Sequence, residues 1–330
     1  MVKSDFIMMK TLAGKLLASR NVLIMTHRRP DGDALGSSMG LALFLQAHNI
    51  NAEVILPDGA PPRFRTLIPA YRSDITLAEA AQFDLFVAVD CANAERLGCG
   101  TELDIELLRQ RNFISIDHHK GNSLTAPQEW LEPAACSASF MVAKLLLASG
   151  KELPVNAATL LLTGIMTDTG NFCFANTDAE AFQIAAELRR CGADTVKIAN
   201  AIFFSKPLKQ LHFEAELINT CFKMACNNRF AYCFVPDELM KKYDFNMAED
   251  EGLIDLLRGI DGAVIAMLCH KRPDGFRVSL RSKENQFPVG PIARELGGGG
   301  HDMAAGCTID LPDFSAVEAL MISKISALLG

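Results

Sequence analysis

A short apolar run that ends in three polar residues constrains the fold of this chain more than any other feature. Residues Phe113–Ile116 have the composition of a buried strand, and Asp117, His118 and His119 follow them directly. In an open α/β sheet, ligands bind at the carboxyl ends of the strands. Because carboxylates and neutral imidazoles are good metal donors, this strand end is a candidate metal site.

Three further apolar runs end in the same way. The run 22–26 leads to His27, Asp31 and Asp33, the run 85–89 leads to Asp90, and the run 159–167 leads to Asp168. We count all four runs as strand-like and expect their polar ends to meet, although residues 156–166 also fit a helix. Each Asp taken alone could instead cap a helix or a turn, and that reading stays open for Asp33, Asp90 and Asp168.

The order of the predicted elements indicates the fold class. Strand-like and helix-like runs alternate through the first half, which predicts an α/β fold with a doubly wound parallel sheet. In the second half, residues 222–225 and 230–235 flank an Asn-Asn turn, and residues 263–269 and 276–280 flank a Pro-Asp-Gly turn. These two hairpins predict a smaller α/β domain with an antiparallel or mixed sheet.

The change of pattern predicts the domain boundaries. We expect a catalytic, metal-binding domain over residues 1–190, a helical linker over 191–211, and a substrate-binding domain over 212–330. The linker carries the break and cap signals Gly192, Asp194 and Pro207.

Charge and cysteine content narrow the class of partner. The formal net charge of −7 argues against a protein that holds long duplex nucleic acid, because such proteins rely on basic surfaces. The ten cysteines form no CxxC pair, and residues 1–10 contain no apolar leader segment. No apolar run approaches the ~18 residues of a membrane span. We therefore expect a cytoplasmic protein with reduced thiols and no membrane association.

The chemistry of the six predicted donors is that of a two-metal site. Two divalent ions about 3.5–4 Å apart can generate a hydroxide nucleophile and hold a phosphoryl oxygen. The predicted metal ligands, two imidazoles and four carboxylates, are His27, Asp31, Asp33, Asp90, His118 and Asp168.

These residues resemble motifs I to IV of the DHH phosphoesterase family. In the second half, the segment 278–282 with Arg281 and Ser282, and Gly297–Gly300 with His301, are similar to the RS and GGGGH motifs of the DHHA1 domain. The resemblance spans both domains in order. Within the family, the chain is most similar to the bacterial oligoribonuclease/pAp phosphatase group, the nanoRNases, where pAp is 3′-phosphoadenosine-5′-phosphate.

The resemblance implies a role for each matched residue. His27, Asp31 and Asp90 would hold one Mn²⁺, and Asp33, Asp90, His118 and Asp168 a second, although Co²⁺ or Fe²⁺ would suit the same donors. Asp117 and His119 would be catalytic, with Asp117 orienting a ligand imidazole and His119 facing the scissile phosphate. The residues implied to bind the substrate are Arg281, Ser282, Gly298, Gly299, Gly300 and His301.

The resemblance further implies a Mn²⁺-dependent exonuclease and phosphatase that hydrolyses short oligoribonucleotides (nanoRNA) and pAp by hydroxide attack. A homodimer is compatible with the sequence. Three alternatives stay open: a hydrolase of linear dinucleotides derived from cyclic messengers, a non-catalytic nucleotide-binding regulator, and a dinucleotide-dependent dehydrogenase. The last is the weakest, because the first strand-to-helix turn lacks the GxGxxG pattern.

Overall fold

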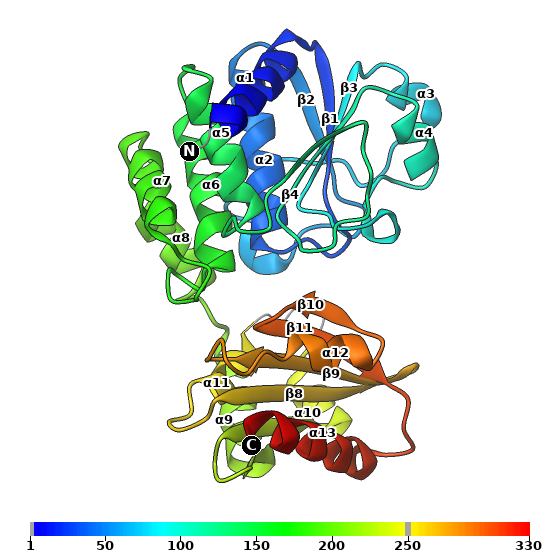
Figure 1. Ribbon diagram of the computed structural model, residues 1–330, viewed down its shortest axis with the longest axis vertical. Coiled ribbons are helices and arrows are strands. Elements are labelled where there is room, and N and C mark those ends of the chain that lie inside the picture. Colours follow the sequence, from blue (N-terminus) through cyan, green and yellow to red (C-terminus); the bar gives the residue numbers. More distant parts are fainter. Residues whose placement is uncertain (1–2, 248–251) are drawn as a thin grey trace. The chain divides into compact units, whose positions relative to one another are not determined.

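The chain divides into two units, Met1–Ser205 and Lys206–Gly330, which are described separately below (Figure 1). The structure is a computed structural model that describes residues 3–247 and 252–330. The predicted domain ranges also include residues 1–2 and 248–251, which lie outside the described part. The division between the units falls within the predicted linker 191–211.

The first unit is built on a five-stranded parallel sheet in the order β2-β1-β3-β4-β5. Every pair of neighbours in it is parallel. The order reverses between β1 and β3, and open α/β sheets bind ligands at such a switch point, outside the carboxyl ends of the strands. The strands are β1 (Asn21–Met25), β2 (Asn51–Ile55), β3 (Leu85–Val89), β4 (Phe113–Asp117) and β5 (Gln128–Leu131).

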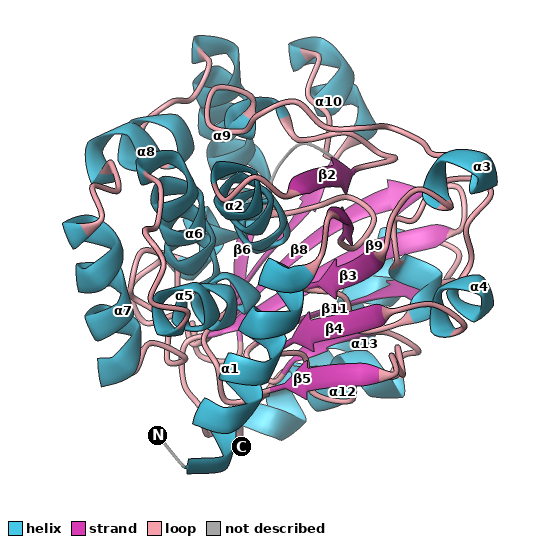
Figure 2. Ribbon diagram, turned by 90° about the horizontal axis from the view of Figure 1, so that it is seen from above, coloured by secondary structure: helices cyan, strands magenta, loops and turns pink. Residues whose placement is uncertain are grey.

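Helices cover both faces of this sheet, which confirms the predicted doubly wound α/β fold (Figure 2). Helices α1, α2, α5 and α6 pack over one core, and the short helices α3 and α4 pack over the other. The helices of this unit are α1 (Lys3–Ala18), α2 (Gly32–Ala47), α3 (Leu77–Ala80), α4 (Ile105–Arg109), α5 (Ala138–Ala148), α6 (Val155–Asp168), α7 (Ala179–Arg190) and α8 (Thr195–Ile202), with 3-10 turns η1 (Pro62–Phe64) and η2 (Ala94–Arg96).

The interpretation of residues 159–167 as a strand is wrong, because they belong to α6. Residues 157–166 of this helix are buried on all sides, and a helix without a polar face reads like a buried strand. Helix α6 runs against α2 in the opposite direction, with Gly36 beside Gly164 and Gly40 beside Leu161. A Cβ at Gly36 would lie 2.6 Å from the Leu160 carbonyl oxygen, so this crossing requires glycine. The close approach brings the end of α6 to the start of α2.

The second unit is built on a six-stranded mixed sheet in the order β10-β11-β9-β8-β7-β6, which confirms the predicted mixed α/β fold. Among the strands that the structure describes in this sheet, only β7 and β8 pair in parallel. Both predicted hairpins form, and Asn227 and Asn228 adopt the positive φ of the first turn. The strands are β6 (Phe222–Ala225), β7 (Phe230–Val235), β8 (Ile265–Arg272), β9 (Gly275–Ser282), β10 (Gly299–His301) and β11 (Ala304–Ile309).

Two sets of helices cover this sheet. Helices α9 (Leu208–Cys221), α10 (Asp237–Tyr243) and α11 (Leu253–Arg258) pack on one face, over a core that includes β7 and β8. Helices α12 (Gly290–Glu295) and α13 (Phe314–Leu329) pack on the opposite face. The glycine run that resembles the GGGGH motif contributes the edge strand β10.

Candidate metal centre and substrate face

Three neighbouring strands and two helix ends deliver the predicted metal ligands. His27 follows β1, Asp90 follows β3, and His118 follows β4. Asp31 and Asp33 lie at the start of α2, and Asp168 is the last residue of α6. Their donor atoms meet in two groups, each within 4.8 Å, namely His27 with Asp31 and Asp90, and Asp33 with His118 and Asp168.

Asp90 belongs to the first group and also faces His118 of the second. Its Oδ2 is 3.7 Å from His27 Nε2, and its Oδ1 is 3.5 Å from His118 Nε2. Asp90 adopts a left-handed backbone conformation with φ 54°, which is uncommon for a residue with a side chain and recurs at functional sites. One carboxylate facing two imidazoles with separate oxygens is the arrangement that a metal-bridging ligand requires.

Backbone carbonyls orient both imidazoles. His27 Nδ1 lies 2.8 Å from the Arg28 carbonyl oxygen, and His118 Nδ1 lies 3.2 Å from that of Ala135. When Nδ1 donates to a carbonyl, Nε2 keeps its lone pair for an ion. The distances from Nε2 to the surrounding carboxylate oxygens are 3.5–3.8 Å, too long for hydrogen bonds. Two donor atoms that bind one ion at about 2.1 Å lie roughly 3.0–3.5 Å apart, so the spacing suits a shared ion.

The two carboxylates at the start of α2 are held by backbone amides. Asp31, not Asp33, caps α2, and its Oδ1 accepts from the amides of Asp33 and Ala34 at 3.0 Å. Asp33 accepts from the Ala138 amide at 2.6 Å and from the Ser139 amide at 2.7 Å, in the first turn of α5. The reading of Asp33 as a helix cap is therefore excluded for its own helix.

The electrostatics of the cluster favour bound cations. Burial, together with the charge of Asp90, raises the pKa of Asp33 to about 7, and burial also raises the pKa of Asp168 well above its usual range. Burial alone would lower the pKa of His27, but Asp31 and Asp90 raise it to about 9. Carboxylates that resist ionisation beside imidazoles that attract protons indicate excess negative charge. Divalent ions would neutralise that charge, and imidazole with carboxylate donors fits such ions.

Asp117 and His119 form a separate pair beside the two groups. Asp117 Oδ1 lies 2.7 Å from His119 Nδ1, whereas the ligand imidazole of His118 bonds to the Ala135 carbonyl. The structure therefore pairs Asp117 with His119 and not with the predicted ligand His118. Burial alone would raise the pKa of Asp117, but the hydrogen bonds with His119 and Asn122 hold it below its usual range. The contact between Asp117 and Nδ1 fixes the orientation of the His119 ring.

Several residues of this site were not found from the sequence. Ala135, Ala138 and Ser139 contribute backbone atoms, which carry no side-chain signal. Asn122, which donates to Asp117, lies in the loop after β4. The only sequence feature that could have pointed to Asn122 is its position three residues after His119.

In the second unit, two predicted substrate-binding residues lie side by side on the sheet. Ala304 on β11 pairs with Arg281 on β9 and with His301 on β10. Directly paired residues of antiparallel strands point to the same face, so Arg281 and His301 flank the small Ala304 side chain. The neighbouring row across the same strands, Ser279, Gly306 and Gly299, is also small, but the guanidinium group of Arg277 lies over Gly306. The small residue that Arg281 and His301 border directly is Ala304.

The remaining predicted substrate residues are placed differently. Ser282 follows Arg281 on β9, so its side chain points to the other face. There it is buried, and its hydroxyl donates to the Glu284 carbonyl oxygen. The structure does not bring it together with Arg281. Gly300 has a φ of 123°, and a Cβ there would lie 2.6 Å from the Ala304 carbonyl oxygen, so the turn of the edge strand requires glycine.

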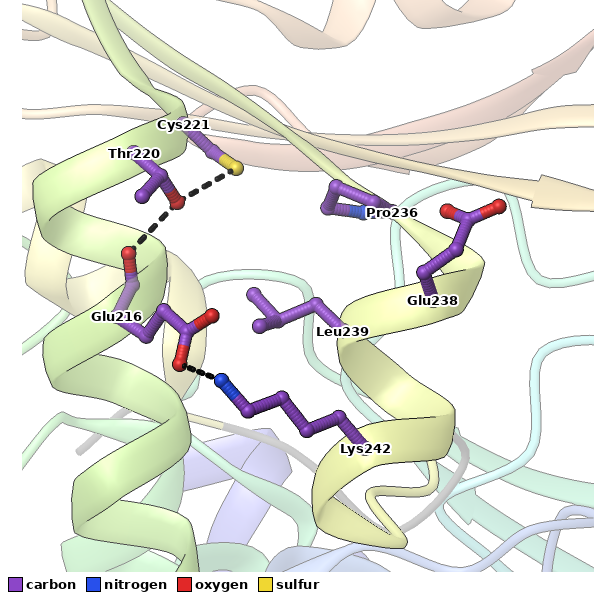
Figure 3. A pocket seen from close by; sticks show the side chains of 7 residues that line it. All are labelled: Glu216, Thr220, Cys221, Pro236, Glu238, Leu239 and Lys242. Carbon is purple, nitrogen blue, oxygen red and sulfur yellow. Dashed lines mark hydrogen bonds and ion pairs between the residues drawn. The ribbon is translucent and has the colours of Figure 1, made fainter.

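A cavity of about 330 Å³ also lies in the second unit, between α9 and α10 (Figure 3). An ion pair between Lys242 and Glu216, 2.5 Å apart, crosses one side of it, and the thiol of Cys221 lies 3.3 Å from the Thr220 hydroxyl. None of the sequence-predicted site residues lines this cavity. It is therefore not the substrate face described above.

Two domain families match the chain. The DHH family, N-terminal domain, matches residues 21–165, and the DHHA1 domain matches residues 227–327. The chain is 31% identical over 290 residues to the bifunctional oligoribonuclease and PAP phosphatase NrnA of Thermus thermophilus. That alignment covers 87% of this chain and 84% of that protein.

Solved structures share the fold. An exopolyphosphatase-related protein from Bacteroides fragilis superposes with a TM-score of 0.83 at 23% identity, covering 98% of this chain and 97% of the other. RecJ from Thermus thermophilus, solved in complex with Mn²⁺, gives a TM-score of 0.55 at 15% identity, covering 98% of this chain and 55% of RecJ. Among the described residues, no helix combines the length and the apolar character needed to cross a membrane.

Proposed function

Because the chain belongs to the DHH family of phosphoesterases and carries a DHHA1 domain, we propose that it hydrolyses short oligoribonucleotides and pAp. One observation supports a hydrolytic enzyme above all others. Two groups of imidazole and carboxylate donors share Asp90 at the switch point of a parallel sheet. A protein that only binds nucleotides has no need of a carboxylate strained into that position.

We propose that the two groups hold two divalent ions, and that Mn²⁺ fills them. His27, Asp31 and Asp90 would form one site, and Asp33, Asp90, His118 and Asp168 the other. Bound ions would lower the pKa of water and neutralise charge on the phosphate. The Mn²⁺ reported for RecJ supports this choice of metal, as do the mixed nitrogen and oxygen donors.

The chain's own residues would position the substrate. His119, fixed through Nδ1 by Asp117, would present Nε2 to the scissile phosphate. Arg281 can bind a phosphate through two parallel hydrogen bonds, and His301 on the same row can contact the same group. The small Ala304 side chain between them would let a nucleotide approach this part of the sheet closely. We take residues 1–190 as the catalytic domain and 212–330 as the substrate domain.

We propose the cytoplasm as the location of the protein. Its ten cysteines are all free thiols, which suits a reducing compartment.

The test is the turnover of defined substrates with Mn²⁺. End-labelled RNAs of about two to about twenty-four nucleotides, pAp and a linear dinucleotide from a cyclic messenger are given to the wild type and to Asp90→Ala. We expect the wild type to prefer the shortest RNAs and pAp, and Asp90→Ala to be inactive on both. Preference for the linear dinucleotide would favour the alternative substrate. Equal rates for the two proteins would reject metal-dependent catalysis at this site, and fewer than two ions per chain at saturation would favour a nucleotide-binding regulator.

A further inference from the structure

The side chain of Asn122 joins two strand ends of the metal-binding unit. Its Nδ2 group donates to Asp117 Oδ2 at 2.5 Å and to the Cys91 carbonyl oxygen at 3.0 Å. Its Oδ1 accepts from the Leu124 amide at 2.8 Å. An amide side chain has two donor hydrogens and one acceptor oxygen, so all three functions of Asn122 have a partner.

The two acceptors of these hydrogen bonds, the Cys91 carbonyl oxygen and Asp117 Oδ2, both lie next to residues of the proposed reaction site. Cys91 directly follows Asp90, the carboxylate shared by the two donor groups. Asp117 is completely buried, and its other oxygen, Oδ1, holds Nδ1 of His119. A chain of hydrogen bonds therefore runs from the backbone beside Asp90 through Asn122 and Asp117 to the imidazole of His119.

The Asp117 carboxylate can contact Nδ1 of His119 through Oδ1 only in one orientation of its plane. The donor from Asn122 occupies Oδ2 and is anchored at its far side by the Cys91 carbonyl, so the carboxylate plane is fixed. Fixing that plane fixes the ring of His119 and directs its Nε2. Without the donor, the buried Oδ2 would lack this partner, and rotation of the carboxylate would turn the ring with it.

We propose that Asn122 is a positioning residue for the phosphoesterase reaction, which acts by holding Asp117 so that His119 presents Nε2 to the substrate. The role given to His119 rests on the proposed function. The competing explanation is that Asn122 only stabilises its own loop through the Leu124 amide.

The isosteric variant Asn122→Asp separates these two explanations. It keeps the oxygen that accepts from the Leu124 amide and loses both donor hydrogens. Ser123→Ala is the matched control, because Ser123 is exposed, lies in the same loop, and engages Ala92 only through its backbone amide. Asn122→Ala is a second variant that adds no charge. All are made in the full-length protein, and thermal unfolding is measured to confirm that each is folded.

We expect Asn122→Asp and Asn122→Ala to lower kcat for pAp about 10- to 100-fold, with KM and bound Mn²⁺ little changed. Ser123→Ala should match the wild type. In a His119→Ala background, adding Asn122→Asp should change kcat less than about twofold, because a residue that acts through His119 has no effect without it. In the metal-free protein, the NMR signal of the His119 Nδ1 proton should be present in the wild type and lost or shifted in both Asn122 variants.

Two results would overturn the proposal. Full additivity of Asn122→Asp and His119→Ala would show that Asn122 does not act through His119. An unchanged His119 Nδ1 proton signal in folded Asn122 variants would show that the ring is held without it. If the wild type hydrolyses none of the substrates, the proposed function fails, whereas the NMR comparison still decides the positioning role.

Discussion

The two units hold their functional side chains in opposite ways. In the first unit, imidazoles and carboxylates are mostly buried at the ends of strands and helices, and backbone amides and carbonyls fix them. In the second unit, Arg281 and His301 stand on a sheet face with the small Ala304 between them. Substitution of a predicted metal ligand in the first unit should therefore alter ion binding and all activity together, whereas substitution of Arg281 or His301 in the second should alter only the use of substrate.

The largest effect expected is that of Asp90→Ala. This substitution removes a donor from both groups, so turnover of pAp and of a dinucleotide should fall by at least about a thousandfold. Bound Mn²⁺ should fall below two ions per chain, as measured by elemental analysis of dialysed protein. If Asp90→Ala were inactive but still bound two ions per chain, ion binding and activity would not be linked in the first unit.

Arg281→Ala should show the opposite pattern. Loss of a charge-assisted contact to phosphate should lower kcat/KM for pAp about 10- to 100-fold, with two ions still bound. Arg281→Lys should recover only part of the loss, because lysine lacks the paired donors of the guanidinium group. A loss of bound ions from Arg281→Ala would show that the two roles are not divided between the units.

The affinity for Mn²⁺ should rise with pH. The carboxylates around His27 raise its pKa to about 9, so below pH 9 the ion-free imidazole is protonated and the ion must displace that proton. The affinity should therefore rise from pH 6 to pH 9 by about tenfold per pH unit for each proton released. Calorimetry in buffers of different ionisation enthalpy measures the proton count. Ion binding without proton release would contradict a ligand role for His27.

The smallest effect expected is at the crossing of α2 and α6. A Cβ at Gly164 would lie 2.8 Å from Asp33 Oδ1 and would overlap the Ser139 hydroxyl. Gly164→Ala should lower the free energy of unfolding by about 1–3 kcal/mol and weaken the Asp33 side of the metal centre. The control Gly14→Ala, in an exposed position of α1 with nothing within 4 Å, should raise it by up to about 1 kcal/mol. Equal effects of the two substitutions would show that the crossing is not tightly packed.

Local chemistry explains what could be predicted from the sequence. Strands β1, β3 and β4 contain apolar runs followed by His27, Asp90 and Asp117, so both their positions and their polar ends can be predicted from the sequence. The turn at Asn227 and Asn228 is visible for the same reason, because asparagine tolerates positive φ. Strand β5 was missed because it is a mostly exposed edge strand in which only Trp130 is buried.

Tertiary packing explains what could not be predicted. Helix α6 has no polar face to reveal its period, and the glycines that bring Asp168 beside Asp33 act only across two helices. The carbonyl that orients His118 belongs to Ala135, and any residue there would supply it. The sequence also does not show whether Asp117 contacts His118 or His119, because that choice depends on the direction of each ring in the folded chain.

The hydrogen bonds from the first turn of α5 to Asp33 have a consequence for metal binding. Both carboxylate oxygens of Asp33 are already held by the Ala138 and Ser139 amides, so the conformational entropy of this side chain is lost when the chain folds. Ion binding therefore requires no further loss of entropy to order Asp33. The ion-free protein should accordingly be preorganised, and loading should require no refolding of the sheet.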